Sequence, residues 1–119
     1  MDRLKDTKTF AKQWVEAWNN RDLEAVLSHY SEDIQFTSPF AVKIFNDPQG
    51  MVKGKAALRD YFSLALSNYP SFRFELISVL EGVQSVTLYY LSVNQLKAAE
   101  VMFFNEKGQV NRVEAHYSP

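Results

Sequence analysis

One acidic residue, Glu100, stands in an otherwise apolar stretch of the chain and has the widest scope for chemistry. Within residues 96–105, alternation puts Glu100 on the same side of a predicted strand as Met102 and Phe104. A carboxyl group desolvated among such neighbours has a raised pKa, so that it can donate a hydrogen bond to a ligand carbonyl or accept a proton as a general base. A register shifted by one residue would instead turn Glu100 toward water or a subunit interface.

Most other kinds of catalytic chemistry have no support in the residue types. The chain contains no cysteine, which excludes disulfides, thiol catalysis and thiolate metal sites. Its two histidines, His29 and His116, are far apart in the sequence, so we expect no metal site. The sequence shows neither a nucleophile with an adjacent base nor a glycine-rich phosphate loop, and we expect no cofactor.

Two tryptophans and a serine are candidate ligand contacts. Trp14 and Trp18 lie four residues apart on a helix predicted over residues 4–19, where both can face the interior. Such a pair either packs a core or contacts a ligand, and the spacing fits both roles. Ser38 precedes Pro39 at the end of a predicted strand, a position suited to turn formation or to ligand binding.

The elements that must position these residues fall into a helical half and a strand half. Apolar residues at steps of three and four predict helices, and Asp22 is a suitable N-cap for the second of them. A turn at residues 31–33 leads into a strand at residues 34–37, and four more strands follow the last helix. The predicted helices cover residues 4–19, 23–30 and 55–69, and the later strands cover residues 71–80, 85–93, 96–105 and 109–118.

One long connection, residues 38–54, separates the first strand from the third helix. It carries a turn-forming cluster at residues 46–50 with apolar residues on both sides, Phe40 among them. A connection of this length often forms a lid or a small hairpin over a site. Plugging the end of the core and contacting a second subunit are equally compatible with its residues.

The two central strands of the strand half are apolar on both faces. In the second of them, Met102 and Phe104 on one face oppose Val101 and Phe103 on the other. Antiparallel strands of this kind need cover on both faces, and three helices cover only one face of a curved sheet. We therefore predict a homodimer that forms through the sheet around a two-fold axis.

Length and charge restrict the class of protein. The 119 residues correspond to a single domain, residues 1–119, and 14% aromatic content leaves rings to line a cavity or an interface. A net charge of −1 and a pI near 6.1 provide no basic surface for nucleic acid or an anionic membrane. The sequence has no apolar run near the ~18 residues of a membrane span, and its start is too charged for a signal peptide, so we expect a cytoplasmic protein.

Several short motifs, spread over nearly the whole chain, together resemble those of one superfamily. The chain resembles the nuclear transport factor 2-like superfamily, and most of all its ketosteroid isomerase and polyketide cyclase-like (SnoaL-like) branch. The resemblance implies an α+β cone, in which a curved antiparallel sheet wraps around three helices from the N-terminal half. The motifs are Trp14, residues 20–22, residues 30–33, residues 38–40, residues 54–55 with Leu58, Tyr61 and Phe62, and residues 100–104 with Gly108.

The resemblance also assigns roles, and the chain departs from two of them. In ketosteroid isomerase an aspartate moves the proton, while a tyrosine and a protonated aspartate stabilise the enolate. The resemblance places these three groups at Ser38, Trp14 and Glu100, and only Glu100 keeps the chemistry. A serine cannot take a proton from carbon without a base of its own, and an indole N–H is a weaker donor than a phenol. The usual steroid isomerase mechanism is therefore contradicted.

The resemblance further implies which side chains point into the cone. It places the strand face of Glu100 inside, and it turns Tyr117 toward the pocket beside Tyr61 and Phe36. On the last strand His116 then points outward, as a surface or dimer-face residue. We expect His29 to be an exposed residue of the second helix.

These inferences lead to two hypotheses for function. In the first, the protein binds a small, mostly apolar or aromatic molecule in a pocket, and Glu100 is the residue available for proton transfer of the isomerase or cyclase kind. In the second, it is a non-catalytic dimerisation or accessory domain whose own side chains fill the cavity. Ligand identity and whether any reaction is catalysed stay open. The predicted ligand-binding residues are Trp14, Trp18, Phe36, Ser38, Phe40, Tyr61, Met102 and Tyr117.

Overall fold

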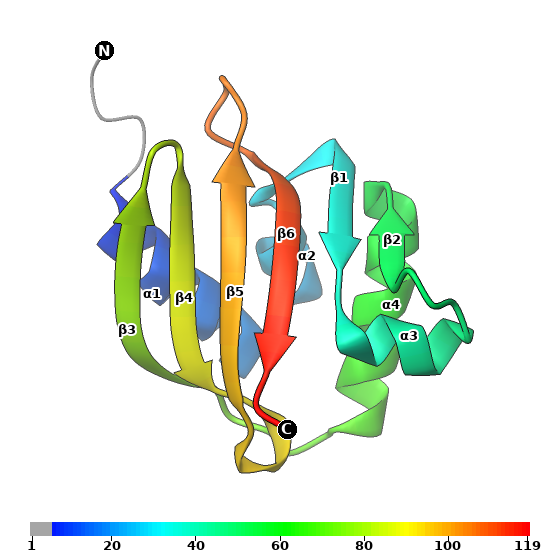
Figure 1. Cartoon of the computed structure of the whole chain (residues 1–119). Helices are drawn as coiled ribbons and strands as arrows, with labels where there is room; N and C mark the ends of the chain where they lie inside the picture. The colour runs from blue at the N-terminus through cyan, green and yellow to red at the C-terminus, as the bar shows by residue number, and fades with distance from the viewer. Residues whose placement is uncertain (1–5) are drawn as a thin grey trace.

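A computed structural model describes residues 6–119, which form one curved six-stranded sheet with four α-helices and a short 3-10 turn (Figure 1). The predicted α+β cone is confirmed, with one more helix and one more strand than expected. The helical elements are α1 (Thr7–Asn19), α2 (Leu23–Leu27), α3 (Pro39–Phe45), α4 (Lys55–Asn68) and η1 (Val93–Gln95). The strands are β1 (Tyr30–Thr37), β2 (Met51–Lys53), β3 (Glu75–Gly82), β4 (Ser85–Leu91), β5 (Lys97–Phe104) and β6 (Val110–Tyr117).

Helices α1 and α2 form a tight corner fixed by capping side chains. Asp6 caps α1 by accepting from the Thr9 amide at 3.2 Å, and the predicted cap Asp22 accepts from the Ala25 amide at 3.1 Å. Between the helices Arg21 has a φ of 59°, a left-handed conformation that reverses the chain. The predicted start of the first helix at residue 4 lies outside the described residues.

Strand β1 is longer than predicted and begins at Tyr30. The prediction placed Tyr30 on the second helix and a turn at residues 31–33, and both assignments are wrong. Tyr30 pairs with Val110, and the Val110 amide donates to the His29 carbonyl at 2.8 Å. This tertiary pairing overrides the local turn preference of residues 31–33. Because β1 runs parallel to β6, the sheet is mixed rather than wholly antiparallel.

The connection over residues 38–54 is an ordered unit rather than an irregular segment. Ser38 caps α3 by accepting from the Phe40 amide at 3.2 Å, and β2 pairs antiparallel with β1. Gly50 has a φ of +60°, and a Cβ there would lie 2.6 Å from Val42 Cγ2, so glycine is needed where β2 returns. The connection itself does not form the small hairpin that was one of the alternatives, because β2 pairs with β1, and α3 was not predicted.

The last four strands form the predicted meander, with shifted boundaries that are largest at β3. Strand β3 begins at Glu75 rather than at residue 71, and it includes the residues 81–82 that were predicted as a turn. The side chain of Asn19 holds Phe74 by accepting from its amide at 2.7 Å and donating to its carbonyl at 3.0 Å. Phe74, directly before β3, is therefore hydrogen-bonded to the end of α1 instead of pairing with β4.

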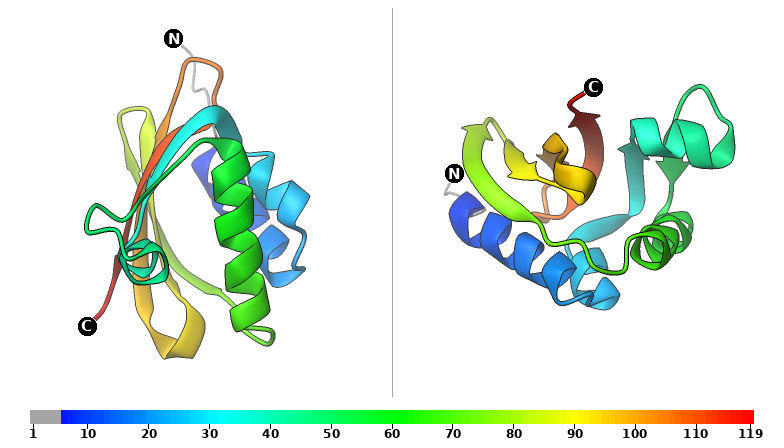
Figure 2. Two further views of the ribbon diagram at one scale, coloured as in Figure 1. Left: turned by 90° about the vertical axis from the view of Figure 1, so that its right-hand side faces the viewer. Right: turned by 90° about the horizontal axis from the view of Figure 1, so that it is seen from below.

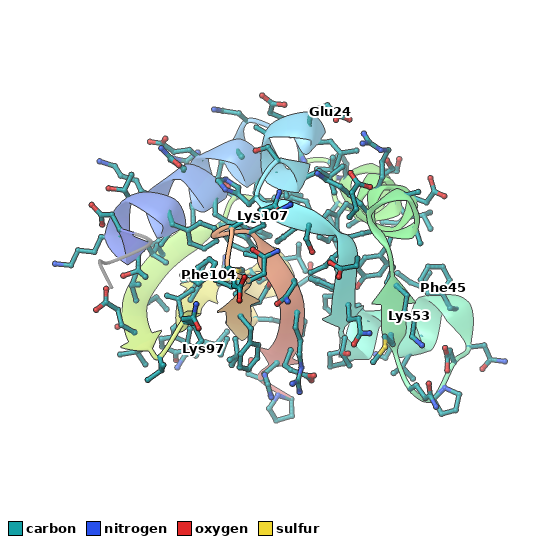
Figure 3. All side chains as sticks on the ribbon, turned by 90° about the horizontal axis from the view of Figure 1, so that it is seen from above. Glu24, Phe45, Lys53, Lys97, Phe104 and Lys107 are labelled. Atoms are coloured by element: carbon teal, nitrogen blue, oxygen red, sulfur yellow. The ribbon has the colours of Figure 1, made fainter. Side chains whose placement is uncertain are left out.

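The sheet has an inner face under the helices and an open outer face. Figure 2 shows α1, α2 and α4 against one face of the curved sheet, and Figure 3 shows side chains filling the space between the two layers while Glu24 projects outward. On β5, Glu100 and Met102 are buried with the inner face, and Val101 and Phe103 are half-buried on the outer face. The predicted register of β5 is the one observed. No helix within residues 6–119 is long and apolar enough to cross a membrane.

Candidate functional site

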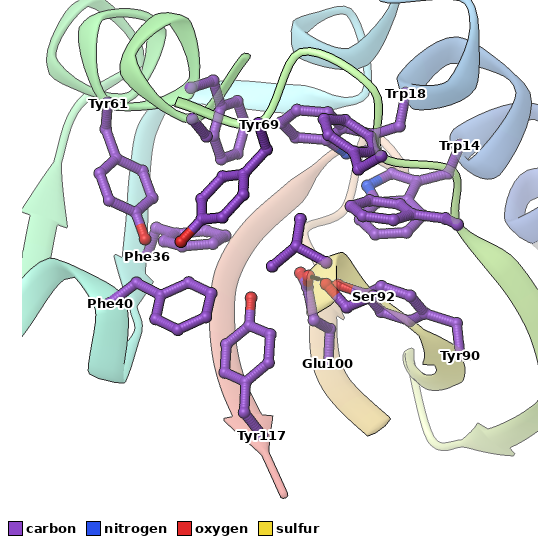
Figure 4. Close-up of a pocket in the computed structure, with 15 residues that line it drawn as sticks. Trp14, Trp18, Phe36, Phe40, Tyr61, Tyr69, Tyr90, Ser92, Glu100 and Tyr117 are labelled. Atoms are coloured by element: carbon purple, nitrogen blue, oxygen red, sulfur yellow. Dashed lines mark hydrogen bonds between the residues drawn. The ribbon is translucent and has the colours of Figure 1, made fainter. Parts of the chain in front are cut away.

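A small cavity of about 60 Å³ lies between the helices and the inner face of the sheet. It lies near α3, the end of β6 and the end of α4, and Figure 4 shows the side chains that surround it. Most of its wall is aromatic. The lining residues are Trp14, Trp18, Phe36, Phe40, Tyr61, Phe62, Ala65, Tyr69, Phe72, Phe74, Tyr90, Ser92, Val93, Glu100 and Tyr117.

Glu100 is the acidic group of this wall, and its two carboxyl oxygens have different surroundings. The side chain is only 4% exposed. Its Oε2 atom accepts a hydrogen bond from the Tyr90 hydroxyl at 2.5 Å. Its Oε1 atom is shielded from solvent and has no hydrogen-bond partner among residues 6–119. A buried oxygen of this kind is rare unless a ligand or water completes its bonding.

Burial decides the protonation of Glu100. Loss of solvation raises the pKa of the carboxyl to about 7, although the hydrogen bond from Tyr90 acts in the opposite direction. Near neutral pH the group is therefore divided between its acid and its carboxylate forms. This balance suits a residue that gives and takes protons.

The tyrosines around Glu100 remain neutral donors. Burial, followed by the charge of Glu100, raises the pKa of Tyr90 well above its ordinary value, and the same two causes act in the same order on Tyr117. Burial likewise raises the pKa of Tyr61 to about 12, and its hydroxyl donates to Ser38 Oγ at 3.3 Å. All three hydroxyls therefore keep their protons over the physiological range.

The two tryptophans on α1 differ in their hydrogen bonding. The indole nitrogen of Trp14 donates to the Tyr30 hydroxyl at 2.9 Å, whereas the indole nitrogen of Trp18 is buried without a partner in the described chain. Their rings meet edge to face with centroids 6.2 Å apart. Both side chains line the cavity, so α1 supplies one satisfied and one unsatisfied donor to the same wall.

Most of the residues predicted to bind a ligand lie together at the cavity, and two lie apart from it. Phe40 from α3 stacks on Tyr117 from β6 with ring centroids 4.4 Å apart, which brings the connection over residues 38–54 against the cavity. Ser38 and Met102 are buried behind the wall and do not line it. Ser38 instead caps α3 and accepts from Tyr61, because its side chain turns toward the helix that it begins.

Tyr90 is the most important site residue that sequence reasoning missed. It pairs with Ala98 across β4 and β5, and so it lies diagonal to Glu100, within reach of a long side chain. The sequence pattern does not show this contact, because the turn at η1 sets the register of β4 against β5. The prediction ended one strand at Val93 and began the next at residue 96, which left only Asn94 and Gln95 to reverse the chain.

Neither histidine takes part in this site. His116 is exposed on the outer face opposite Ala99, as predicted. His29 lies beyond the end of α2 and is half-buried, with its ring edge-on to Phe10 at 5.1 Å, so its prediction as an exposed helix residue is wrong. In the described part of the chain, no group of three or more histidine, aspartate or glutamate side chains is placed to hold a metal ion.

A curved sheet wrapped around helices, with a pocket between the two layers, defines the nuclear transport factor 2-like class. Residues 11–117 match the SnoaL-like domain, and the chain belongs to that family, which confirms the predicted resemblance. The structure is similar to that of a SnoaL-like protein of unknown function from Burkholderia thailandensis, with a TM-score of 0.94 at 34% sequence identity. That match covers 99% of this chain and 100% of the other.

More distant structures share the fold. A nuclear transport factor 2-like protein of unknown function from Burkholderia pseudomallei matches with a TM-score of 0.75 at 20% identity, over 96% of this chain and 92% of that one. SalBIII, an epoxide hydrolase/cyclase-like enzyme described in pyran ring formation in the polyether salinomycin, matches with a TM-score of 0.74 at 16% identity, over 94% and 90%. No curated protein matches the sequence.

Proposed function

We propose that this protein binds a small, mostly apolar molecule in the cavity and moves a proton on it with Glu100. The observation that carries the proposal is the buried, unpartnered Oε1 atom of Glu100 in an aromatic wall. A cyclase-like enzyme among the structural neighbours supports the same class of chemistry. The isomerase and cyclase reactions of this class need an acid or a base, and they need no cofactor to supply it.

The surroundings of Glu100 assign each carboxyl oxygen a part in this chemistry. Tyr90 donates to Oε2, which stabilises the carboxylate form. Oε1 is then the atom that exchanges a proton with the ligand. When Glu100 acts as a base, a C–H bond beside a ligand carbonyl breaks, its proton moves to Oε1 and its electron pair delocalises onto the carbonyl oxygen. Return of the proton to another atom of the enolate completes an isomerisation.

Hydrogen exchange on a simple ketone tests the proposal. In deuterium oxide, the wild-type protein should accelerate exchange of the protons beside the carbonyl of 2-indanone, followed by proton NMR. Glu100→Gln should lose at least about tenfold of that acceleration, since general acid–base groups typically contribute more than this. The rate should rise as pH passes about 7, where the carboxylate becomes the major form.

Glu114→Gln is the matched control for this experiment. Glu114 pairs with Val101 on the outer face, so its substitution removes a carboxylate without touching the cavity. It should exchange 2-indanone at the wild-type rate. Equal rates for the wild type and Glu100→Gln would contradict the role of Glu100.

A second candidate function is a non-catalytic accessory domain, and one observation favours it. The cavity is only about 60 Å³, because rings such as Phe72 and Phe74, stacked at 4.7 Å, occupy much of the interior. In this alternative the protein itself fills the space a ligand would take. Failure of 2-indanone to shift any NMR resonance of the lining residues would favour the accessory function.

We also propose that the outer face of the sheet joins a second copy of the chain. In the isolated chain Tyr89, Val101 and Phe103 are half-buried there, and Leu80 at the same face is 59% exposed. The Arg112 guanidinium lies 5.0 Å from the centre of the Phe103 ring and pairs with Glu114, which gives the apolar area a charged border. Patches with this arrangement commonly form subunit contacts.

Sedimentation velocity tests the dimer. The wild type should sediment as a dimer, and Val101→Lys should shift it to the monomer, because the new ammonium group would be desolvated at the interface. A wild-type chain that sediments as a monomer at micromolar concentration would contradict this proposal. The cavity proposal does not depend on the result.

A further inference from the structure

Three buried side-chain nitrogen or oxygen atoms in the described chain lack a hydrogen-bond partner, and two of them belong to residues that line the cavity. These are the indole nitrogen of Trp18 and Oε1 of Glu100. The third, on Arg21, belongs to a side chain outside the cavity wall, where the guanidinium donates to the Tyr69 carbonyl at 2.8 Å. Buried polar groups are paired in the great majority of cases, so two such atoms around one cavity point to a missing occupant.

The two atoms come from opposite walls. Trp18 reaches the cavity from helix α1 and Glu100 from strand β5, and Figure 4 shows the two side chains on different sides of the space. Both side chains are more than nine-tenths buried, with 5% and 4% exposure respectively. The rest of the cavity wall is largely aromatic, with Trp14, Phe74 and Tyr90 in mutual contact. An occupant that satisfies both atoms therefore needs polar groups at two ends of an apolar body.

We infer that Trp18 is a specificity-determining residue, and that the ligand of this cavity is a small ring compound with two separate oxygen functions. This inference rests on the proposed function and names the class of molecule that the cavity takes. An indole N–H only donates, so the ligand oxygen at Trp18 must be an acceptor such as a carbonyl. Oε1 of Glu100 accepts from a hydroxyl when ionised and donates to a carbonyl when protonated.

Trp14 provides the contrast within the same wall. Its indole N–H is already bonded to the Tyr30 hydroxyl, so a ligand gains nothing by offering it an acceptor. The ring of Trp18 is held edge-on to Phe62 with centroids 4.7 Å apart, and this contact orients the indole without satisfying its donor by a conventional acceptor. A hydrocarbon in the cavity would leave Trp18 and Glu100 unpaired, which selects against such ligands.

Matched cyclohexane derivatives test the inference. The probes are 4-hydroxycyclohexanone, which carries both oxygens, cyclohexanone, which lacks the hydroxyl, and cyclohexanol, which lacks the carbonyl. All three are small, and none carries an aromatic ring that would itself displace nearby resonances. The binding of each is followed at pH 8 through the two indole N–H resonances of the nitrogen-15-labelled protein.

At this pH the Glu100 carboxylate should accept a hydrogen bond from the hydroxyl of 4-hydroxycyclohexanone, and the carbonyl of the same probe should accept one from the Trp18 indole. We expect 4-hydroxycyclohexanone and cyclohexanone to move the Trp18 indole proton downfield, while cyclohexanol leaves it nearly in place. The Trp14 indole proton should move little with any probe. We expect 4-hydroxycyclohexanone to bind about fivefold more tightly than cyclohexanol, the worth of one neutral hydrogen bond.

Trp18→Phe separates the hydrogen bond from the packing of the ring. In this variant the fivefold preference for 4-hydroxycyclohexanone over cyclohexanol should disappear, while any change in cyclohexanol affinity reports the altered packing of the ring. The probe series on the wild type gives the same answer independently, so the test does not rely on the variant folding.

The outcomes distinguish the inference from the proposed function beneath it. Equal affinities of 4-hydroxycyclohexanone and cyclohexanol, with an unmoved Trp18 indole proton, would overturn the role of Trp18 and leave ligand binding intact. If no probe moved the Trp18, Trp14 or cavity-lining resonances, both the inference and the binding function would fail, and the accessory alternative would stand.

Discussion

The interior of this protein has a packed region and an open region, and they differ in how their polar groups are satisfied. In the packed region Tyr30 is fully buried and its hydroxyl is bonded to Trp14. In the open region Glu100 and Trp18 each keep a buried polar atom unpaired. Trp14 and Trp18 are the same residue type one helical turn apart, so the difference arises from what faces each side chain. Residue type alone therefore does not show whether a polar group of the cavity wall is paired.

The largest effect that would sharpen this comparison is the pH dependence of stability at Glu100. Its pKa is about 7 in the folded state against 4.5 for a solvated glutamate, so the folded state binds more protons between these values and stability falls as pH rises through that interval. Glu100→Gln avoids this loss. From pH 4.5 to pH 7 it should gain on the wild type by about 3 kcal/mol, and the gain should stay constant at higher pH.

Urea unfolding at pH 5 and at pH 8 measures this difference. The free energy of unfolding of Glu100→Gln, relative to that of the wild type, should be much higher at pH 8 than at pH 5. A difference that is the same at both pH values would mean that Glu100 is solvated in the folded state, and the distinction between the two regions would lose its main support.

The next effect compares the two tryptophans directly. Trp14→Phe removes the donor to a buried hydroxyl as well as ring volume, and we expect it to lower the free energy of unfolding by about 3 kcal/mol. Trp18→Phe removes a donor without a partner, and its cost should be about 1 kcal/mol. Chemical denaturation of both variants at one pH checks the order. Equal costs would break the comparison, because they would show that the Trp14–Tyr30 bond contributes little.

The smallest effect concerns the one hydrogen bond that Glu100 does make. Because the Tyr90 hydroxyl lowers the Glu100 pKa against the effect of burial, Tyr90→Phe should raise the Glu100 pKa further above its wild-type value of about 7. Carbon-13 NMR of the labelled glutamate side chains follows the titration. An unchanged pKa would mean that Tyr90 does not stabilise the carboxylate.

Much of the fold was predictable because the elements with strong periodicity lie where their patterns put them. Helix α1 buries Trp14 and Trp18 together, and β5 turns Glu100 inward as its alternation and the family resemblance implied. Local patterns gave the wrong secondary structure where contacts between residues far apart in the sequence determine it. Residues 31–33 have turn chemistry but pair in β1, and α3 is too short to show a clear helical period.

The candidate site was predictable in outline and not in its hydrogen bonds. Aromatic residues with the right spacing were found, among them Trp14, Trp18 and Tyr117. The bond from Tyr90 depends on the register across η1, and the unpaired state of Trp18 depends on which hydroxyl reaches which indole. These are properties of the assembled interior, so no pattern in the sequence contains them. For Ser38 a local interaction is decisive instead: its side chain caps α3 and does not line the cavity.

The position of the two tryptophans also makes the protein its own optical reporter. The chain has two tryptophans, and their rings meet with centroids 6.2 Å apart beside the cavity. All indole fluorescence therefore originates at the cavity wall, and two chromophores this close couple in the near-ultraviolet circular dichroism spectrum. Occupancy of the cavity and ionisation of Glu100 can thus be followed by light on the unlabelled chain, which makes a ligand screen possible before any activity is known.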